Sequence, residues 1–246
     1  MQYDIRLSYD ILFNSMKTIY SILFAALLGT YCFSASADAP PVVKDFHGIA
    51  SGGPIQVMVT IGNTESIQFE GDEEAIATLI AEVKGGILII RPKNSWKSWA
   101  KTYENKKIVA HVNAKSISSL IISGDGSLSV TGLVTAAALT TTLSGSGSLK
   151  AEIDADQLTT VISGSGQLSL SGKASKVSAT LSGSCNFDGK ELSADHLSGK
   201  ISGSGVISIQ ANKSIKATIL GSGKVLYSGN PSIEKTLIGS GEVSEL

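Results

Sequence analysis

The sequence holds 246 residues with nearly balanced charge, 20 Lys and Arg against 21 Asp and Glu, and a pI near 6.3. This balance argues against a nucleic-acid-binding surface, so we expect no nucleic-acid partner. Hydrophobic residues make up 42% of the chain and aromatic residues only 6%, alongside 26 glycines, which is typical of short, closely stacked β-strands.

The N-terminal 37 residues have the pattern of a secretory signal peptide. Met16-Lys17 precedes an apolar run ending at Leu28, and Ala35-Ser36-Ala37 forms an A-x-A cleavage site. Residues 1–15 carry no targeting pattern and are interpreted as upstream sequence read from an early Met. Because the apolar run is too short to span a bilayer comfortably, we favour a cleaved signal over a membrane anchor. The mature chain is therefore expected to have no transmembrane helix.

Two cysteines bear on export. Cys32 offers the alternative of a lipidated N-terminus, but Gly29-Thr30-Tyr31 before it is bulky where lipoprotein signals have small residues. Cleavage after Ala37 leaves Cys185 as the single thiol, so no intramolecular disulfide can form. Cys185 is interpreted as a small residue that fills a turn. We expect an exported protein, located in the periplasm, on the outer-membrane surface or outside the cell.

Residues 38–122 are predicted to form a mostly β segment with one short helix. The helix is expected from Asp72 to Ile80, because acidic residues occupy its first turn, and Gly85-Gly86 is expected to turn the chain. Apolar runs predict strands at 46–49, 55–61, 66–70, 87–90 and 107–112.

A polar loop from Pro92 to Lys106 carries the best candidates for ligand contact, Trp96, Trp99 and Tyr103. Aromatic rings flanked by lysines could stack on sugar rings or engage an anionic glycan. The alternative, which we favour, is that the loop folds over an open end or face of the β-structure and buries these rings.

Residues 123–246 contain a repeated Ser-Gly-Ser-Gly phrase. Its first glycines are separated by 21, 19, 19, 20, 18 and 18 residues, a regularity that a low-complexity linker does not keep. They are expected to be structural turn residues that permit positive φ at corners. These glycines are Gly124, Gly145, Gly164, Gly183, Gly203, Gly221 and Gly239.

Apolar and polar residues alternate between the glycine turns. The sixth, fourth and second residues before each turn read large, small and large, as in Val177, Ala179 and Leu181. Each repeat therefore predicts two short strands and two turns, with one face of each strand buried. A unit of 18–21 residues cannot close its own core, so the repeats are expected to stack as a solenoid. An antiparallel meander is the alternative, and the constant period disfavours it.

The order of these features resembles a known family. Phe46-His47-Gly48-Ile49 leads into a strand, Phe69-Glu70-Gly71-Asp72 precedes the helix, and serial glycine turns follow. This arrangement, over about residues 46–241, resembles the "putative auto-transporter adhesin, head GIN domain" family, which is frequent in Bacteroidetes. The resemblance implies a right-handed parallel β-helix-like stack. It supplies no catalytic residues.

The sequence predicts no enzyme, no cofactor and no metal site. His47, His111 and His196 have no metal-ligand spacing, and one mature cysteine makes a zinc site implausible. Neither a G-x-S-x-G nucleophile turn nor a phosphate-binding loop with its lysine occurs. We therefore expect a non-enzymatic envelope or surface protein of structural or adhesive role.

The alternative function is a pectinase- or lyase-like enzyme acting on polysaccharides, because parallel β-helices often house them. Such enzymes need acids stacked on one face. Asp154, Asp156, Asp188 and Asp195 fall at different offsets from their turns, so stacking is not expected. A cell-surface glycan or an envelope protein is the expected partner, and a homo-oligomer remains open.

The signal sequence gives a direct prediction. Export should cleave the chain between Ala37 and Asp38, because the A-x-A site lies directly before that bond. N-terminal sequencing of the exported protein should begin Asp38-Ala39-Pro40. A mature chain that starts at a lipidated Cys32 would contradict the prediction.

Overall fold

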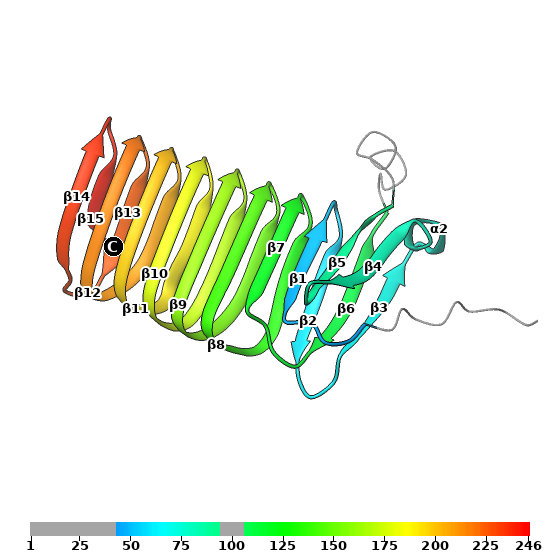
Figure 1. Cartoon of the computed structure of the whole chain (residues 1–246). Coiled ribbons are helices and arrows are strands. Elements are labelled where there is room, and N and C mark those ends of the chain that lie inside the picture. Colours follow the sequence, from blue (N-terminus) through cyan, green and yellow to red (C-terminus); the bar gives the residue numbers. More distant parts are fainter. Residues whose placement is uncertain (1–42, 94–105) are drawn as a thin grey trace, which may run out of the picture. The chain divides into compact units, whose positions relative to one another are not determined.

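The computed structural model describes residues 43–93 and 106–246 of the chain, all within one compact unit, Pro40–Leu246. This unit is a parallel β-solenoid in which successive coils lie side by side (Figure 1). The predicted fold class is confirmed, and the antiparallel meander is excluded because strands β7 to β15 pair in parallel.

The repeat region forms long strands that bend at their corners. Each coil from β8 to β12 is one continuous strand with register shifts near its middle, where two short strands with a turn between them were expected. Backbone pairing thus continues around this corner. The strands are β7 (Ser119–Gly124), β8 (Ser127–Gly145), β9 (Ser148–Gly164), β10 (Gln167–Gly183), β11 (Asn186–Gly203), β12 (Val206–Gly221), β13 (Lys224–Ser228), β14 (Ser232–Ile238) and β15 (Glu242–Glu245).

The N-terminal segment enters the stack out of sequence order. Strand β1 (Gly48–Gly52) lies between β5 (Ile87–Pro92) and β7, while β2 (Gln56–Ile61) lies between β6 (Ile108–Ala114) and β8. The chain therefore makes one coil, leaves it, adds a coil on its outer side and returns to continue the stack from β7.

Antiparallel strands cover the outer side of this first end. Strand β3 (Ser66–Gly71) pairs with β6, and β4 (Leu79–Lys84) pairs with β5. Between them, helix α2 (Glu73–Ile76) is shorter than expected, because the chain resumes extended pairing at Leu79. The apolar run that begins at Leu79 therefore serves as a strand that the sequence pattern had assigned partly to the helix.

All seven turn glycines have positive φ, between 106° and 118°. At Gly145 an added Cβ would lie 2.4 Å from the carbonyl oxygen of Gly124 in the preceding coil. That same oxygen accepts a hydrogen bond from the Ser146 N–H at 3.0 Å. The turns stack through main-chain hydrogen bonds, and only glycine leaves room for this approach.

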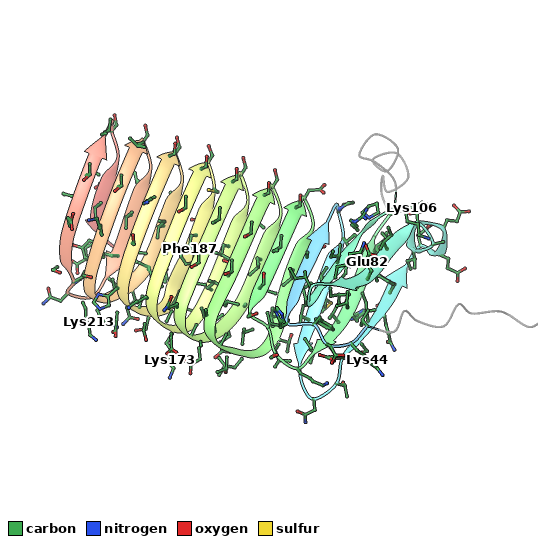
Figure 2. The ribbon with its side chains drawn as sticks, viewed as in Figure 1. Lys44, Glu82, Lys106, Lys173, Phe187 and Lys213 are labelled. Carbon is green, nitrogen blue, oxygen red and sulfur yellow. The ribbon has the colours of Figure 1, made fainter. Side chains whose placement is uncertain are left out.

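Inward side chains fill the interior in columns. Leu158, Val177, Leu197 and Ile215 form one column, and each is at most 2% exposed. Phe187, the largest fully buried side chain, is placed within the coils (Figure 2). A second inward column, which we call the small column, includes Ala179 and Gly199, and these leave volume for larger neighbours. Thr141 and Thr160 in the same column are buried, and their hydroxyl oxygens lie 2.8 Å apart.

Inward positions should dominate the free energy of unfolding. Leu181→Ala should lower it by about 2–5 kcal/mol, because Leu181 is 1% exposed and truncation leaves a cavity. Thr180→Ala, the outward neighbour, should cost less than about 1 kcal/mol. Denaturant unfolding measures both, and equal effects would mean that the inward and outward assignments are wrong.

Candidate functional site

The predicted ligand-contact residues Trp96, Trp99 and Tyr103 lie outside the described residues. The described surface instead offers a flat face of hydroxyl side chains and several shallow hollows. These features lie on the regular strands, where the pairing register fixes the position of each side chain.

The face consists of outward residues on the strand segment that precedes each glycine turn. Two of its columns carry a hydroxyl in every coil from β7 to β11, and we call them the hydroxyl face. The first column is Ser119, Thr140, Thr159, Ser178 and Ser198, and the second is Ser123, Ser144, Ser163, Ser182 and Ser202. The column between them is mixed, with Ile121, Thr142, Val161, Thr180 and Lys200.

The geometry of this face follows from β-pairing. Neighbouring hydroxyls in one column are separated by about 4.8 Å, the distance between paired strands, and adjacent columns by about 6.6 Å along a strand. Ser144, Ser163 and Ser182 are all exposed. Because their side chains are short, the face is flat and presents a regular array of groups that can both donate and accept hydrogen bonds.

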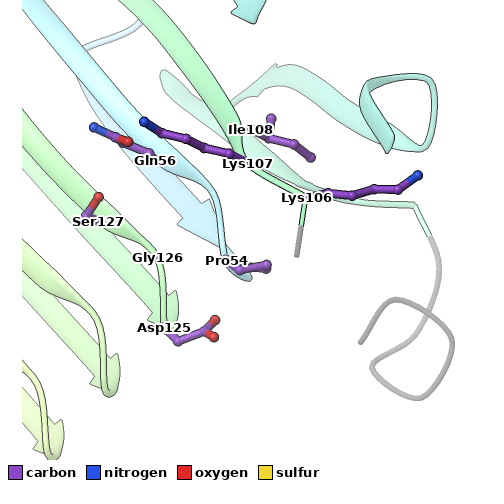
Figure 3. A pocket seen from close by; sticks show the side chains of 8 residues that line it. All are labelled: Pro54, Gln56, Lys106, Lys107, Ile108, Asp125, Gly126 and Ser127. Atoms are coloured by element: carbon purple, nitrogen blue, oxygen red, sulfur yellow. The ribbon is translucent and has the colours of Figure 1, made fainter. Parts of the chain in front are cut away.

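One hollow of about 320 Å³ lies where β2, β6 and the first glycine turn meet (Figure 3). Asp125 on the turn and Lys107 at the start of β6 are its exposed charged groups. Asp125 occupies the place that Ser146 and Ser165 occupy in the next turns. The hollow is therefore lined by charges of both signs.

Lys106, which also lines this hollow, is engaged elsewhere. Its Nζ lies 2.9 Å from Oδ1 of Asp72 and 3.6 Å from Oε2 of Glu74. The hydrogen bond from Lys106 lowers the pKa of Asp72, and the N–H of Ala75 lowers it further. The same bond raises the pKa of Lys106. This cluster orders the start of α2, where Asp72 is the N-cap.

A second hollow of about 370 Å³ lies on β9 to β12, at the edge of the hydroxyl face. We call it the His196 hollow. It is lined by Gln157, Leu158, Thr159, Lys176, Val177, Ser178, His196, Leu197, Ser198, Ser214 and Lys216. His196 Nδ1 and the Ser214 hydroxyl oxygen are 2.7 Å apart.

A third hollow of about 250 Å³ lies on the opposite half of the coils. It is lined by Lys150, Ala151, Ser169, Leu170, Ser171, Asp188, Lys190 and Glu191, and we call it the Asp188 hollow. Lysines and acids alternate around it, so its charges largely offset one another.

Three acidic residues of the coils, Asp154, Asp188 and Asp195, stand beside lysines or serines. Asp154 pairs in register with Lys173, and their charged groups are 3.2 Å apart. Asp188 lies between Ser169 and Ser208. Figure 2 shows Lys173 and Lys213 along one edge of the coils, and Lys213 holds the Asp195 carboxylate at 2.9 Å. Hydrogen bonding to Lys213 lowers the pKa of Asp195.

The three histidines are spread over separate parts of the fold. His47 lies 3.2 Å from the Ser118 hydroxyl, and His111 lies 3.0 Å from the Glu70 carboxylate. Across residues 43–93 and 106–246, no three His, Cys, Asp or Glu side chains are grouped so that they could hold a metal ion.

The sequence matches the family described as "Putative auto-transporter adhesin, head GIN domain" over residues 45–231. The chain belongs to this family. The match covers the first end of the solenoid and the coils through β13. No curated protein matches the sequence.

Solved structures with the same fold include proteins from Bacteroides and Parabacteroides. A putative adhesin from Bacteroides fragilis is 22% identical with a TM-score of 0.75 over 85% of this chain and 95% of that one. A putative lipid binding protein from Parabacteroides distasonis is 23% identical with a TM-score of 0.67, and a putative adhesin from Parabacteroides merdae is 20% identical with a TM-score of 0.64. Both alignments also cover 85% of this chain and 95% of the other. At these identities the similarity establishes the fold.

A membrane-spanning helix is not found in the part of the head GIN chain that the structure describes. Helix α2, with 4 residues, is far shorter than a bilayer requires.

Cys185 of this head GIN chain lies inside a glycine turn. It stands where Gly166 and Gly205 stand in the adjacent coils, and it is 1% exposed. Its Sγ lies 3.8 Å from the carbonyl oxygen of Ile162. Burial raises the pKa of the Cys185 thiol.

The folded protein should therefore react slowly with thiol reagents. The thiolate is the reactive form, and burial disfavours it while also blocking access. Labelling with a chromogenic disulfide reagent should be at least about tenfold slower in buffer than in denaturant. Comparable rates in the two conditions would show that Cys185 is accessible in the fold.

Proposed function

We propose that this head GIN protein is an exported, non-enzymatic interaction module that adheres through its hydroxyl face to a cell-surface glycan or envelope component. The observation that carries the proposal is the continuous array of serine and threonine hydroxyls on five successive coils. The adhesin family and the predicted signal sequence support this role at the cell envelope.

A flat array suits an extended ligand. A small metabolite is usually enclosed in a concave pocket, whereas the hollow at the edge of the hydroxyl face is shallow and open. A polymer that lies along the face could place successive groups against successive coils. Each contact would be weak, and many coils together would supply the affinity.

A glycan fits the chemistry of the face better than an apolar ligand does. Sugar hydroxyls exchange hydrogen bonds with Ser144, Ser163 and Ser182 without leaving buried polar groups unpaired. A lipid chain would need an apolar cavity, but inward side chains such as Leu168, Phe187 and Ile207 fill the interior and are at most 1% exposed. A polysaccharide is accordingly the favoured partner.

The proposal is tested by blocking the middle of the face. Thr180→Arg projects a long charged side chain from the centre of the array, so binding of an uncharged glycan should fall by at least about tenfold. Gln167→Arg is the matched control, because Gln167 is exposed on the same strand but lies beyond the glycine turn. Glycan-array binding of the exported protein measures both variants, with melting temperature confirming that each is folded.

Three results decide the matter. Loss of glycan binding in Thr180→Arg alone supports the hydroxyl face. Equal binding by both variants overturns the face as the adhesive surface. Release of shorter saccharides from a bound polysaccharide would overturn the non-enzymatic role and favour the polysaccharide-acting alternative.

A further inference from the structure

We propose that the His196 hollow binds the acidic group of a sugar, a carboxylate or a sulfate, and so makes the adhesive face selective for anionic glycans. The inference rests on the proposed function, since the hollow lies at the edge of the hydroxyl face and shares Thr159, Ser178 and Ser198 with it. It adds the chemical class of the ligand.

Three basic side chains, two lysines and a histidine, border the hollow from three successive strands. Lys176 on β10 pairs in register with His196 on β11, so the two stand one strand spacing apart, about 4.8 Å. Lys216 on β12 pairs with Ser198, two residues farther along. A fourth, Lys200, stands exposed on the hydroxyl face two residues beyond Ser198.

Two of these lysines form no ion pair with an acid in the described part of the chain. Within the described residues, neither Lys176 nor Lys200 forms an ion pair, although most other lysines of this half of the coils do. Lys216 Nζ lies 2.9 Å from Glu234, and that pair is largely exposed to solvent. Asp195, the nearest acid in sequence to His196, is held by Lys213 at 2.9 Å.

The lining of the hollow therefore differs from that of the other two. Its lining includes two lysines and a histidine without an aspartate or glutamate, whereas Asp125 lines the first hollow and Asp188 and Glu191 line the third. The lining of this hollow therefore carries more positive than negative charge. Such a local excess attracts anions and raises their rate of association.

The neutral groups of the hollow complete the match to a sugar. Four hydroxyls, from Thr159, Ser178, Ser198 and Ser214, surround the cations and can accept or donate hydrogen bonds. Leu158, Val177 and Leu197 also line the hollow and are each at most 2% exposed, so its apolar part belongs to the packed core. An acidic sugar would place its anion near Lys176 and its hydroxyls against the serines.

The test compares each charged probe with its uncharged form. Oligogalacturonate should bind the exported protein at least about tenfold more tightly than its methyl ester, or a heparin oligosaccharide more tightly than its desulfated form. The first result assigns a carboxylate and the second a sulfate. Binding should weaken as NaCl is raised, because the site is exposed to solvent. Calorimetric titration measures both preferences.

The variants locate the site. Lys176→Gln with Lys216→Gln should remove the preference for the charged probe, while Lys150→Gln with Lys190→Gln, in the Asp188 hollow, should keep it. The inference is overturned if neither charged probe is preferred by the unaltered protein, or if the first double variant keeps the preference. Should neutral glycans still bind and Thr180→Arg still abolish that binding, the proposed function would stand while this inference fails.

Discussion

The fold depends on main-chain hydrogen bonds that keep every coil in register with the next. The Ser165 N–H donates to Gly145 and the Ser184 N–H to Gly164, each at 2.9 Å, so the turns themselves are part of the ladder. Their close approach excludes a Cβ at the glycines, which is why the glycine phrase recurs where other surface positions vary. Register then fixes which side chains share a column, inside and outside.

Packing restricts the side chains of the inner columns, but it does not restrict those of the outer face. Inside, volumes must complement one another: Phe187 stands in a column otherwise filled by residues such as Leu168 and Ile207, and the small column includes Gly199. Outside, side chains are free of packing, so serine and threonine can be repeated for their hydroxyls alone. The face is therefore available for recognition without cost to the core.

The period of the repeat made the solenoid predictable, because a nearly constant period places equivalent positions of successive coils in the same column. The order of the first coils was not predictable from the pattern. Strands β1 and β2 lie between strands that follow them in the chain, and alternation of apolar and polar residues does not indicate which strand pairs with which.

The His196 hollow was missed for a similar reason. Lys176, His196 and Lys216 are about 20 residues apart in sequence, and only the inter-coil register brings them together. The period of the glycine turns could have indicated this cluster, because it aligns the three positions once the register shifts between coils are known.

The two ends of the described stack differ in the strands that form their outer edges. At the first end, antiparallel β3 and β4 close the run of parallel coils. At the other end every residue of β14 is exposed, including Ile233, Leu237 and Ile238. An exposed apolar edge strand of this kind can pair with another chain.

Lys235 on β14, however, stands in the column of the buried Ala217, where the other coils place small or apolar residues. A coil stacked directly on β14 would have to bury that ammonium group without a partner, which is costly. Lys235 therefore acts against end-to-end stacking of coils on β14.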